Sequence, residues 1–245
     1  IYEPIPVVPT CHYMMGGTPT NINGQAFNRI DGTDSIIPGL FAAGEAACVS
    51  VHGANRLGGN SLLDLVVFGR ATGMFIQEDL KSGGGVKSAD KDDIDNALDR
   101  LNTLNNSDSG YETAEVKKEL QQCMQNYFGV FRRGEFMKKG LDELQEIREK
   151  VDQLHLKDKS NAFNTSRVEA IELQNLFEVA EATAIAAYSR DESRGAHARD
   201  DFPDRDDERW LCHSLYDPLS KTVSKRDVNF NPSEVEAFPP IVRTY

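Results

Sequence analysis

The residues from His52 to Asp64, His-Gly-Ala-Asn-Arg-Leu-Gly-Gly-Asn-Ser-Leu-Leu-Asp, hold more groups able to do chemistry than any other stretch of the chain. Arg56 carries a planar guanidinium that suits a carboxylate or a phosphate. The three glycines allow positive φ angles or a close approach of the backbone to a ligand. The apolar run from Leu62 predicts a buried helix, whose amino end favours an anion or an electron-rich ring edge. The stretch therefore predicts an anion-binding loop that leads into a helix.

Two residues elsewhere could add to such a site. His12 lies between a β-like run and a glycine turn. It can donate a hydrogen bond to an anion, although alone an ordinary loop histidine is the simpler interpretation. A histidine and an arginine that converge on one pocket form a carboxylate clamp, so Arg56 strengthens the case for His12. Glu45 could accept from a ribose or ribityl hydroxyl, or only supply charge at a helix start. His52 could belong to the site or only support its loop.

Composition narrows the possible functions. The 245 residues carry a formal net charge of -12 at pH 7, so we expect no nucleic-acid partner, because a polyanion would be repelled over most of the surface. Four widely spread cysteines without a CxxC pair indicate reduced thiols and no metal site. Apolar runs shorter than the roughly 20 residues of a membrane span, and no signal peptide, predict a soluble chain that could still dock on a membrane complex. Its start at Ile1, directly before an apolar run, indicates a piece of a longer protein.

Residues 1–82 contain the elements that must position these groups. Short β-like runs alternate with turn residues up to about residue 41, which predicts a β-meander. A further strand over 40–43 ends at Gly44 and Glu45, the usual place for a ligand in an open α/β sheet. Apolar residues surround most of the helix predicted over 61–80, so we expect its first turns to be buried. The glycine-rich residues 81–85 indicate a domain boundary.

Residues 88–190 predict a helical bundle. Apolar residues recur at helical spacing in three sets, within 94–104, 116–131 and 137–154. A fourth helix is predicted after Ser166, with Glu169 completing a capping box. Four helices with short links favour an antiparallel bundle.

Residues 191–245 predict a small domain that contains β structure, which makes the whole chain α+β. The charged run 190–209 lacks the order of acidic residues and glycine that a calcium loop needs, so it predicts a solvated or interface loop. Residues 210–216 and 222–230 alternate as two strands around a turn at Asp217 and Pro218.

Five strings carry a resemblance to a known family: Pro-Thr-Cys-His-Tyr-Met-Met-Gly-Gly at 9–17, Gly-Leu-Phe-Ala-Ala-Gly-Glu at 39–45, the stretch 52–64, Ser-Arg-Gly-Ala-His at 193–197 and Pro-Pro-Ile-Val-Arg-Thr-Tyr at 239–245. The full chain resembles the carboxyl-terminal part of the flavoprotein subunits of the succinate dehydrogenase family. This implies part of an FAD-binding α/β domain over 1–82, a helical bundle over 88–190 and a C-terminal cap over 191–245. It also implies that succinate is oxidised to fumarate by hydride transfer to FAD. Electrons would pass to an iron–sulfur subunit and a quinone, with membrane-anchor subunits as indirect partners.

The resemblance gives each candidate residue a role. His12 and Arg56 correspond to ligands of the substrate carboxylates. Glu45 corresponds to an FAD contact, and Ser61 and Leu62 to backbone contacts with the flavin.

The resemblance also places essential parts of the site before this chain: the dinucleotide-binding glycine motif, the histidine bonded covalently to FAD and a capping domain with a proton-transfer arginine. We therefore expect that this chain alone neither holds FAD nor oxidises succinate. The implied location is the cytoplasmic face of a bacterial inner membrane or the mitochondrial matrix face. A fumarate reductase, an L-aspartate oxidase, or a purely helical docking module over 90–190 remains as an alternative.

Overall fold

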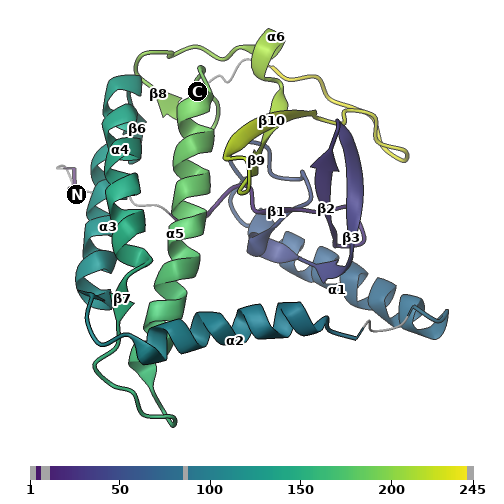
Figure 1. The fold of residues 1–245 in the computed structure, drawn as a ribbon. Helices are drawn as coiled ribbons and strands as arrows, with labels where there is room; N and C mark the ends of the chain where they lie inside the picture. The colour runs from purple at the N-terminus through teal and green to yellow at the C-terminus, as the bar shows by residue number, and fades with distance from the viewer. Residues whose placement is uncertain (1–3, 7–11, 85–87, 242–245) are drawn as a thin grey trace.

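The computed structural model describes residues 4–6, 12–84 and 88–241 and is mixed α and β, as the sequence predicts (Figure 1). Its helices are η1 (Gly44–Ala46, a 3-10 turn), α1 (Asn60–Lys81), α2 (Lys91–Asn106), α3 (Thr113–Tyr127), α4 (Gly134–Val151), α5 (Thr165–Ser189) and α6 (Asp207–Trp210). Its strands form five pairs: β1 (Thr18–Pro19) with β4 (Ala47–Cys48), β2 (Gln25–Ile30) with β3 (Thr33–Phe41), β5 (Tyr111–Glu112) with β7 (Leu154–His155), β6 (Phe131–Arg132) with β8 (Ala198–Arg199), and β9 (Cys212–Asp217) with β10 (Thr222–Asp227). The β-like run expected over residues 5–10 lies largely outside the described residues.

The first part of the chain is an antiparallel hairpin, β2–β3, with α1 packed beside it (Figure 1). Asp31 and Gly32 form the turn with φ of 49° and 79°, which matches the handedness that two-residue hairpin turns need. Helix and hairpin meet closely at Gly24, where a methyl group would lie 2.0 Å from the hydroxyl oxygen of Thr72. The expected meander is thus a hairpin with the short pair β1–β4 next to it.

The prediction that the first turns of α1 are buried is wrong for the described residues. In α1 only Asp64 and Thr72 are fully buried. Large apolar side chains on its other faces lie exposed: Leu62, Leu63, Leu65, Val66 and Val67. The helix packs on η1, and Phe75 meets Phe41 of β3 with the ring centres 6.2 Å apart. Because the sequence is apolar all round, no single stripe marks the packed face.

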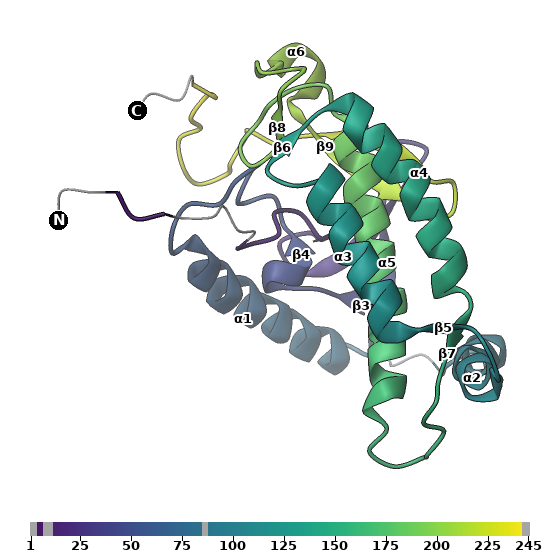
Figure 2. The ribbon, with the colours of Figure 1, turned by 90° about the vertical axis from the view of Figure 1, so that its left-hand side faces the viewer.

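Helices α3, α4 and α5 lie side by side and form the main hydrophobic core (Figures 1 and 2). The stripes predicted for α3 and α4 are largely buried, and Leu144 and Phe177 are completely buried, whereas Leu176 and Val179 of α5 are exposed at 41% and 44%. Helix α2 instead lies across the end of the other three, and its predicted apolar face is only partly used. Leu104 is buried, whereas Ile94 and Leu98 are about half exposed, at 47% and 50%. The bundle therefore consists of three helices that lie side by side and a fourth helix that crosses their end.

Helix α5 begins two residues earlier than predicted. Its N-cap is Asn164, whose side-chain oxygen accepts a hydrogen bond from the N–H of Arg167 at 2.8 Å. The capping box expected from Ser166 and Glu169 is wrong, because Asn164 already satisfies the free N–H of the first turn.

The last part of the chain joins both preceding parts. The predicted two-strand hairpin is confirmed as β9–β10. Arg226 in β10 contacts Asp34 in β3 at 2.7 Å, and Tyr216 in β9 donates to buried Glu181 of α5 at 3.1 Å.

Of the helices in the described ranges, none is long and apolar enough to cross a membrane.

Candidate functional site

Tyr13 connects the two segments that the sequence singles out. The guanidinium carbon of Arg56 lies 4.7 Å from the centre of the Tyr13 ring. The ring of His52 meets the same tyrosine edge-on, with the ring centres 5.6 Å apart. A side-chain hydrogen bond links Tyr13 to Ser61. The tyrosine therefore brings the start of the chain against the loop and against the first turn of α1.

Burial raises the pKa of Tyr13, and the charges of Asp64 and Glu45 act in the same direction. The hydrogen bond with Ser61 and the positive charge of Arg56 oppose this rise. The hydroxyl therefore stays protonated at neutral pH and remains a neutral partner for the groups around it.

His52 and Asp64 form a pair beneath this cluster. Nε2 of His52 lies 3.0 Å from Oδ2 of Asp64, whose side chain is almost completely buried. The other atom of each group, Nδ1 of His52 and Oδ1 of Asp64, is buried without a hydrogen-bond partner among the described residues. Because unpaired buried polar atoms cost free energy, these two atoms indicate a site that lacks a polar partner.

Arg56 has spare hydrogen-bonding capacity. Its Nη1 makes a long contact of 3.4 Å with the carbonyl oxygen of Leu57, and its Nε is buried and has no partner in the described part of the chain. No carboxylate among those residues forms an ion pair with it. A guanidinium held by an aromatic ring and lacking a carboxylate partner is suited to bind one from a ligand.

The other predicted residues surround this cluster with different degrees of contact. His12 is exposed and precedes Tyr13 directly, so it lies at the same edge. Glu45 is exposed and accepts a hydrogen bond from the N–H of Met14 at 3.1 Å. The N–H of Leu62 already donates to the carbonyl oxygen of Gly59 at 3.1 Å, so a contact with a flavin would have to share that bond.

The start of α1 fits an electron-rich group. Its N-cap residue, Gly59, has φ of 81° and offers no side-chain oxygen to the N–H groups of the first turn, of which those of Asn60 and Leu62 donate to backbone carbonyl oxygens at 3.1 Å. These N–H groups carry the partial positive charge of the helix end. The exposed side chains of Leu62, Leu63 and Val66 stand beside it, as the wall of an apolar ring system requires. The chain therefore provides both a polar end and an apolar surface for a flavin. No group of acidic, histidine and cysteine side chains in the described ranges could hold a metal ion.

The C-terminal part of the chain contacts the loop between β4 and α1, which carries Arg56. The N–H of Ala196 donates to the carbonyl oxygen of Ala54 at 3.0 Å, and Nε2 of His213 lies 3.0 Å from the hydroxyl of Ser50. The chain following α5 therefore contacts the loop at two points, four residues apart.

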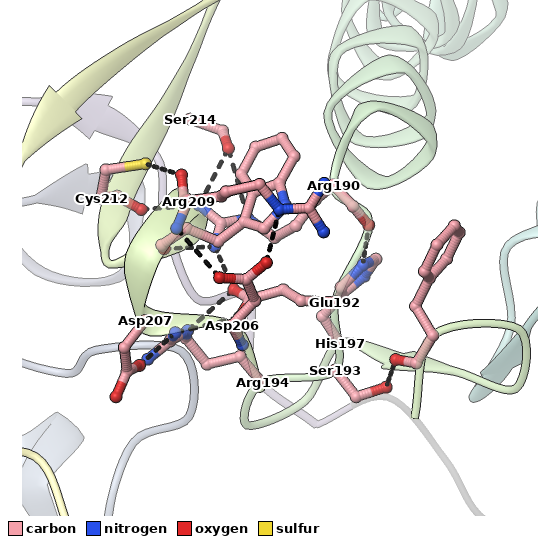
Figure 3. A network of polar contacts seen from close by, with 12 residues as sticks. Arg190, Glu192, Ser193, Arg194, His197, Asp206, Asp207, Arg209, Cys212 and Ser214 are labelled. Carbon is pink, nitrogen blue, oxygen red and sulfur yellow. Dashed lines mark hydrogen bonds and ion pairs between the residues drawn. The ribbon is translucent and has the colours of Figure 1, made fainter. Parts of the chain in front are cut away.

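The charged run 190–209, which predicts a solvated or interface loop, is exposed over most of 200–209 but contains two buried charged residues. Glu192 and Arg199 are buried, at 0% and 3% exposure, and both take part in ion pairs with neighbours from the same run. In Figure 3 the side chains of Arg190 and Arg194 converge on the carboxylate of Glu192. The sequence does not single out these two buried residues, because a charge run has the same composition whether its charges pair with one another or with water.

Sequence reasoning did not select Tyr13 or Asp64, although both stand in the strings that it examined. The signal for Asp64 was a single carboxylate in an otherwise apolar helix start, twelve residues after His52. Tyr13 had no such signal, because only the fold brings it to the loop.

Two family models match the chain. One, described as the C-terminal part of the fumarate reductase flavoprotein, matches residues 117–245, and an FAD binding domain model matches residues 2–62. The succinate dehydrogenase flavoprotein subunit of Coxiella burnetii is 52% identical over 97% of this chain. The fumarate reductase flavoprotein subunit of Mycobacterium tuberculosis is 36% identical over the whole chain. A solved structure of a mutated E. coli quinol fumarate reductase superposes on 98% of the chain with a TM-score of 0.83 and 37% identity.

The chain spans about 40% of the length of each of these relatives: 40% of the Coxiella protein, 41% of the mycobacterial protein and 40% of the E. coli chain.

Proposed function

The chain belongs to the succinate dehydrogenase and fumarate reductase flavoprotein family, and from this premise we propose that the complete protein oxidises succinate to fumarate. The observation that carries the proposal is Arg56, whose guanidinium is stacked on Tyr13 and has no carboxylate partner in the described part of the chain. A dicarboxylate would supply that partner. FAD is the cofactor of the family and, when bound, supplies the acceptor for the hydride that leaves succinate.

Arg56 and His12 bind the substrate carboxylates in this proposal. Arg56 offers a fork of N–H donors fixed by the ring of Tyr13, so little side-chain entropy is lost when a carboxylate binds. His12, at the same edge, donates a second hydrogen bond. Holding a dianion at two points fixes the carbon that is oxidised relative to the hydride acceptor, which is the main way that such a site accelerates the reaction.

Glu45, Ser61 and Leu62 line the place where we propose that FAD lies. The amino end of α1, which has no side-chain cap, would stabilise negative charge on a reduced ring through the partial positive charge of the helix end. Nδ1 of His52 and Oδ1 of Asp64, buried and without a hydrogen-bond partner among the described residues, support the proposal that a polar group completes the site.

We propose the division of the chain that the sequence predicted: residues 1–82 as part of an FAD-binding domain, 88–190 as a helical domain and 191–245 as a small C-terminal domain. Family membership supports succinate and fumarate as ligands and an iron–sulfur subunit as the electron acceptor. It also supports a quinone beyond that subunit and indirect contact with membrane-anchor subunits. The protein would then work at the cytoplasmic face of a bacterial inner membrane or at the mitochondrial matrix face.

Arg56→Ala in the complete, FAD-loaded protein tests the proposal. We expect succinate turnover to fall by several orders of magnitude, because a fixed charge is removed at the reacting centre. Arg133→Ala is the matched control, since Arg133 is half exposed and its ion pair among the described residues is with Asp200, at 3.0 Å. Near-normal turnover by the Arg56 variant would contradict the enzymatic role of this loop and favour a docking function for residues 90–190.

Fumarate reduction is the second candidate, because the E. coli fumarate reductase superposes closely on the chain. The two directions use the same dicarboxylate contacts, so the loop itself does not distinguish them. Turnover of the complete protein, measured with succinate and a quinone and then with fumarate and a quinol, separates the two.

A further inference from the structure

We propose that Glu192, which lies outside the candidate site, is a positioning residue that fixes the loop carrying Arg56. This rests on the proposed function, in which Arg56 binds a substrate carboxylate. Glu192 is completely buried, and its carboxylate accepts hydrogen bonds from Arg190 at 2.5 Å, from Arg194 at 2.8 and 2.9 Å and from the N–H of Asp206 at 2.9 Å (Figure 3). One carboxylate therefore joins two arginines that lead to different points of the loop.

The first connection runs through Arg194. The N–H groups of Arg194 and His197 donate to each other's carbonyl oxygens, at 2.8 and 3.0 Å, and close a tight turn. At the tip of this turn, Gly195 has φ of 60° and approaches Ala54 so closely that a methyl group would lie 2.5 Å from its carbonyl oxygen. The next N–H in the turn, that of Ala196, donates to the same oxygen at 3.0 Å. By holding the Arg194 side chain, Glu192 orients a turn that contacts the loop two residues before Arg56.

The second connection runs through Arg190. Its guanidinium donates to the carbonyl oxygen of Cys212 at 2.6 Å and to the hydroxyl of Ser214 at 3.0 Å, and these residues flank His213 in β9. His213 in turn contacts the hydroxyl of Ser50 at 3.0 Å. The same carboxylate thus also orients the strand that holds the beginning of the loop.

The side chain of Glu192 is ionised at neutral pH. Burial alone would raise the pKa of this carboxyl, but the hydrogen bonds from Arg194, the Asp206 N–H and Arg190 outweigh burial and hold the pKa below its usual value. The group is therefore a carboxylate at neutral pH. Removing its charge takes away the counter-charge that Arg190 and Arg194 share, and Arg194 keeps only Asp207, at 2.7 Å, among the ion pairs of the described residues. The weaker attraction would loosen the turn and the strand.

The consequence for the reaction follows from geometry. A guanidinium displaced by about 1 Å binds a carboxylate less well and can slow a reaction on the order of 100-fold. In the described part of the chain, no hydrogen bond or ion pair joins the start of α1 to Glu192, Arg190 or Arg194. Loss of the Glu192 charge should therefore weaken dicarboxylate binding while the FAD content stays the same.

The test uses the complete holoenzyme with Glu192→Gln and, as matched control, Glu178→Gln, which changes an exposed carboxylate paired with Arg148 in the bundle. Malonate, a non-reacting dicarboxylate, is titrated while the flavin absorbance is followed, and the KM and kcat for succinate are measured. We expect Glu192→Gln to raise the malonate Kd and the succinate KM at least tenfold with full FAD content, and the control to change neither. Gly195→Ala, which pushes on Ala54 without changing any charge, should shift the same two constants in the same direction.

The outcomes separate the two proposals. If Arg56→Ala leaves the malonate Kd unchanged, the proposed function fails. If Arg56→Ala abolishes malonate binding while Glu192→Gln and Gly195→Ala both behave as the control does, the positioning role is overturned and the proposed function stands. If Glu192→Gln does not fold, Gly195→Ala decides the matter alone: a normal malonate Kd with full FAD content overturns the proposal.

Discussion

Protonation of His197 should destabilise the folded chain in a defined pH window. Its Nδ1 lies 2.8 Å from Nη1 of Arg132 and its Nε2 lies 3.0 Å from the carbonyl oxygen of Arg190. A guanidinium can only donate, so Nδ1 must accept and Nε2 must carry the proton. The imidazolium form would direct a second N–H at Arg132, and the fold therefore holds the neutral ring.

The size of the effect follows from the pKa. Burial, with the positive charges of Arg132, Arg199 and Arg190, lowers the pKa of His197 from 6.5 to about 4. The unfolded chain then binds more protons than the folded chain between these values, so stability falls as the pH falls from 6.5 to 4. The full loss is about 3 kcal/mol at 1.36 kcal/mol per pKa unit. At pH 5.5, still above the isoelectric point of about 4.9, the loss relative to pH 8 is about 1.4 kcal/mol.

Urea unfolding at pH 8 and pH 5.5 measures this loss. Trp210 is the only tryptophan in the chain, is nearly buried and lies 5.0 Å from the guanidinium carbon of Arg190, so its fluorescence reports on the same region. His197→Asn keeps an acceptor for Arg132 but cannot titrate. We expect the wild type to lose about 1.4 kcal/mol more than this variant between the two pH values.

His155→Asn is the control, because His155 bonds to the backbone of Ser107 on the far side of the bundle. It should retain the loss seen in the wild type. The reasoning is refuted if His197→Asn loses as much stability between pH 8 and pH 5.5 as the wild type does.

Three further predictions test the packing and the completeness of the site. Gly24→Ala should cost about 1–3 kcal/mol more than Gly32→Ala, since both glycines have φ near 75–80° but only Gly24 faces Thr72; equal unfolding free energies would contradict this. Leu144→Ala should cost about 2–5 kcal/mol by thermal or urea unfolding, and half-exposed Leu98→Ala much less. The purified 245-residue chain should show no flavin absorbance and no succinate-dependent dye reduction, and either signal would show that it holds a working site.

From the sequence, the apolar face of a helix can be predicted, but whether another segment covers that face cannot. Most of the apolar stripe of α4 is buried, because α3 and α5 pack against it, and Leu141 is partly buried. An apolar stripe also predicts α2, but the helical spacing of its apolar residues does not show that Ile94 and Leu98 stay about half exposed. The first turns of α1 show the same limit, since apolar composition says that a surface should be covered and not by which segment.

The candidate site is predictable only in part for a related reason. Arg56 and the glycines are local signals, and the fold places them in one loop, as expected. The contact of that loop with Tyr13 joins segments far apart in the chain, and no spacing rule links them. The partners of Glu192 are near in sequence, but its burial depends on how the whole run folds. A carboxylate among arginines becomes recognisable as buried only when the surrounding chain is in place.

The two contacts that hold the loop have a consequence for biosynthesis. Ser50 and His213 are 163 positions apart, so the ribosome adds the second partner roughly 8–30 s after the first at about 5–20 residues per second. During that interval the loop has been synthesised, but the residues that contact it, Ala196 and His213, have not both been synthesised. Cofactor and substrate should therefore bind only after β9 has been translated. A chain stalled within α5 would contain folded helices, but the position of Arg56 would not yet be fixed.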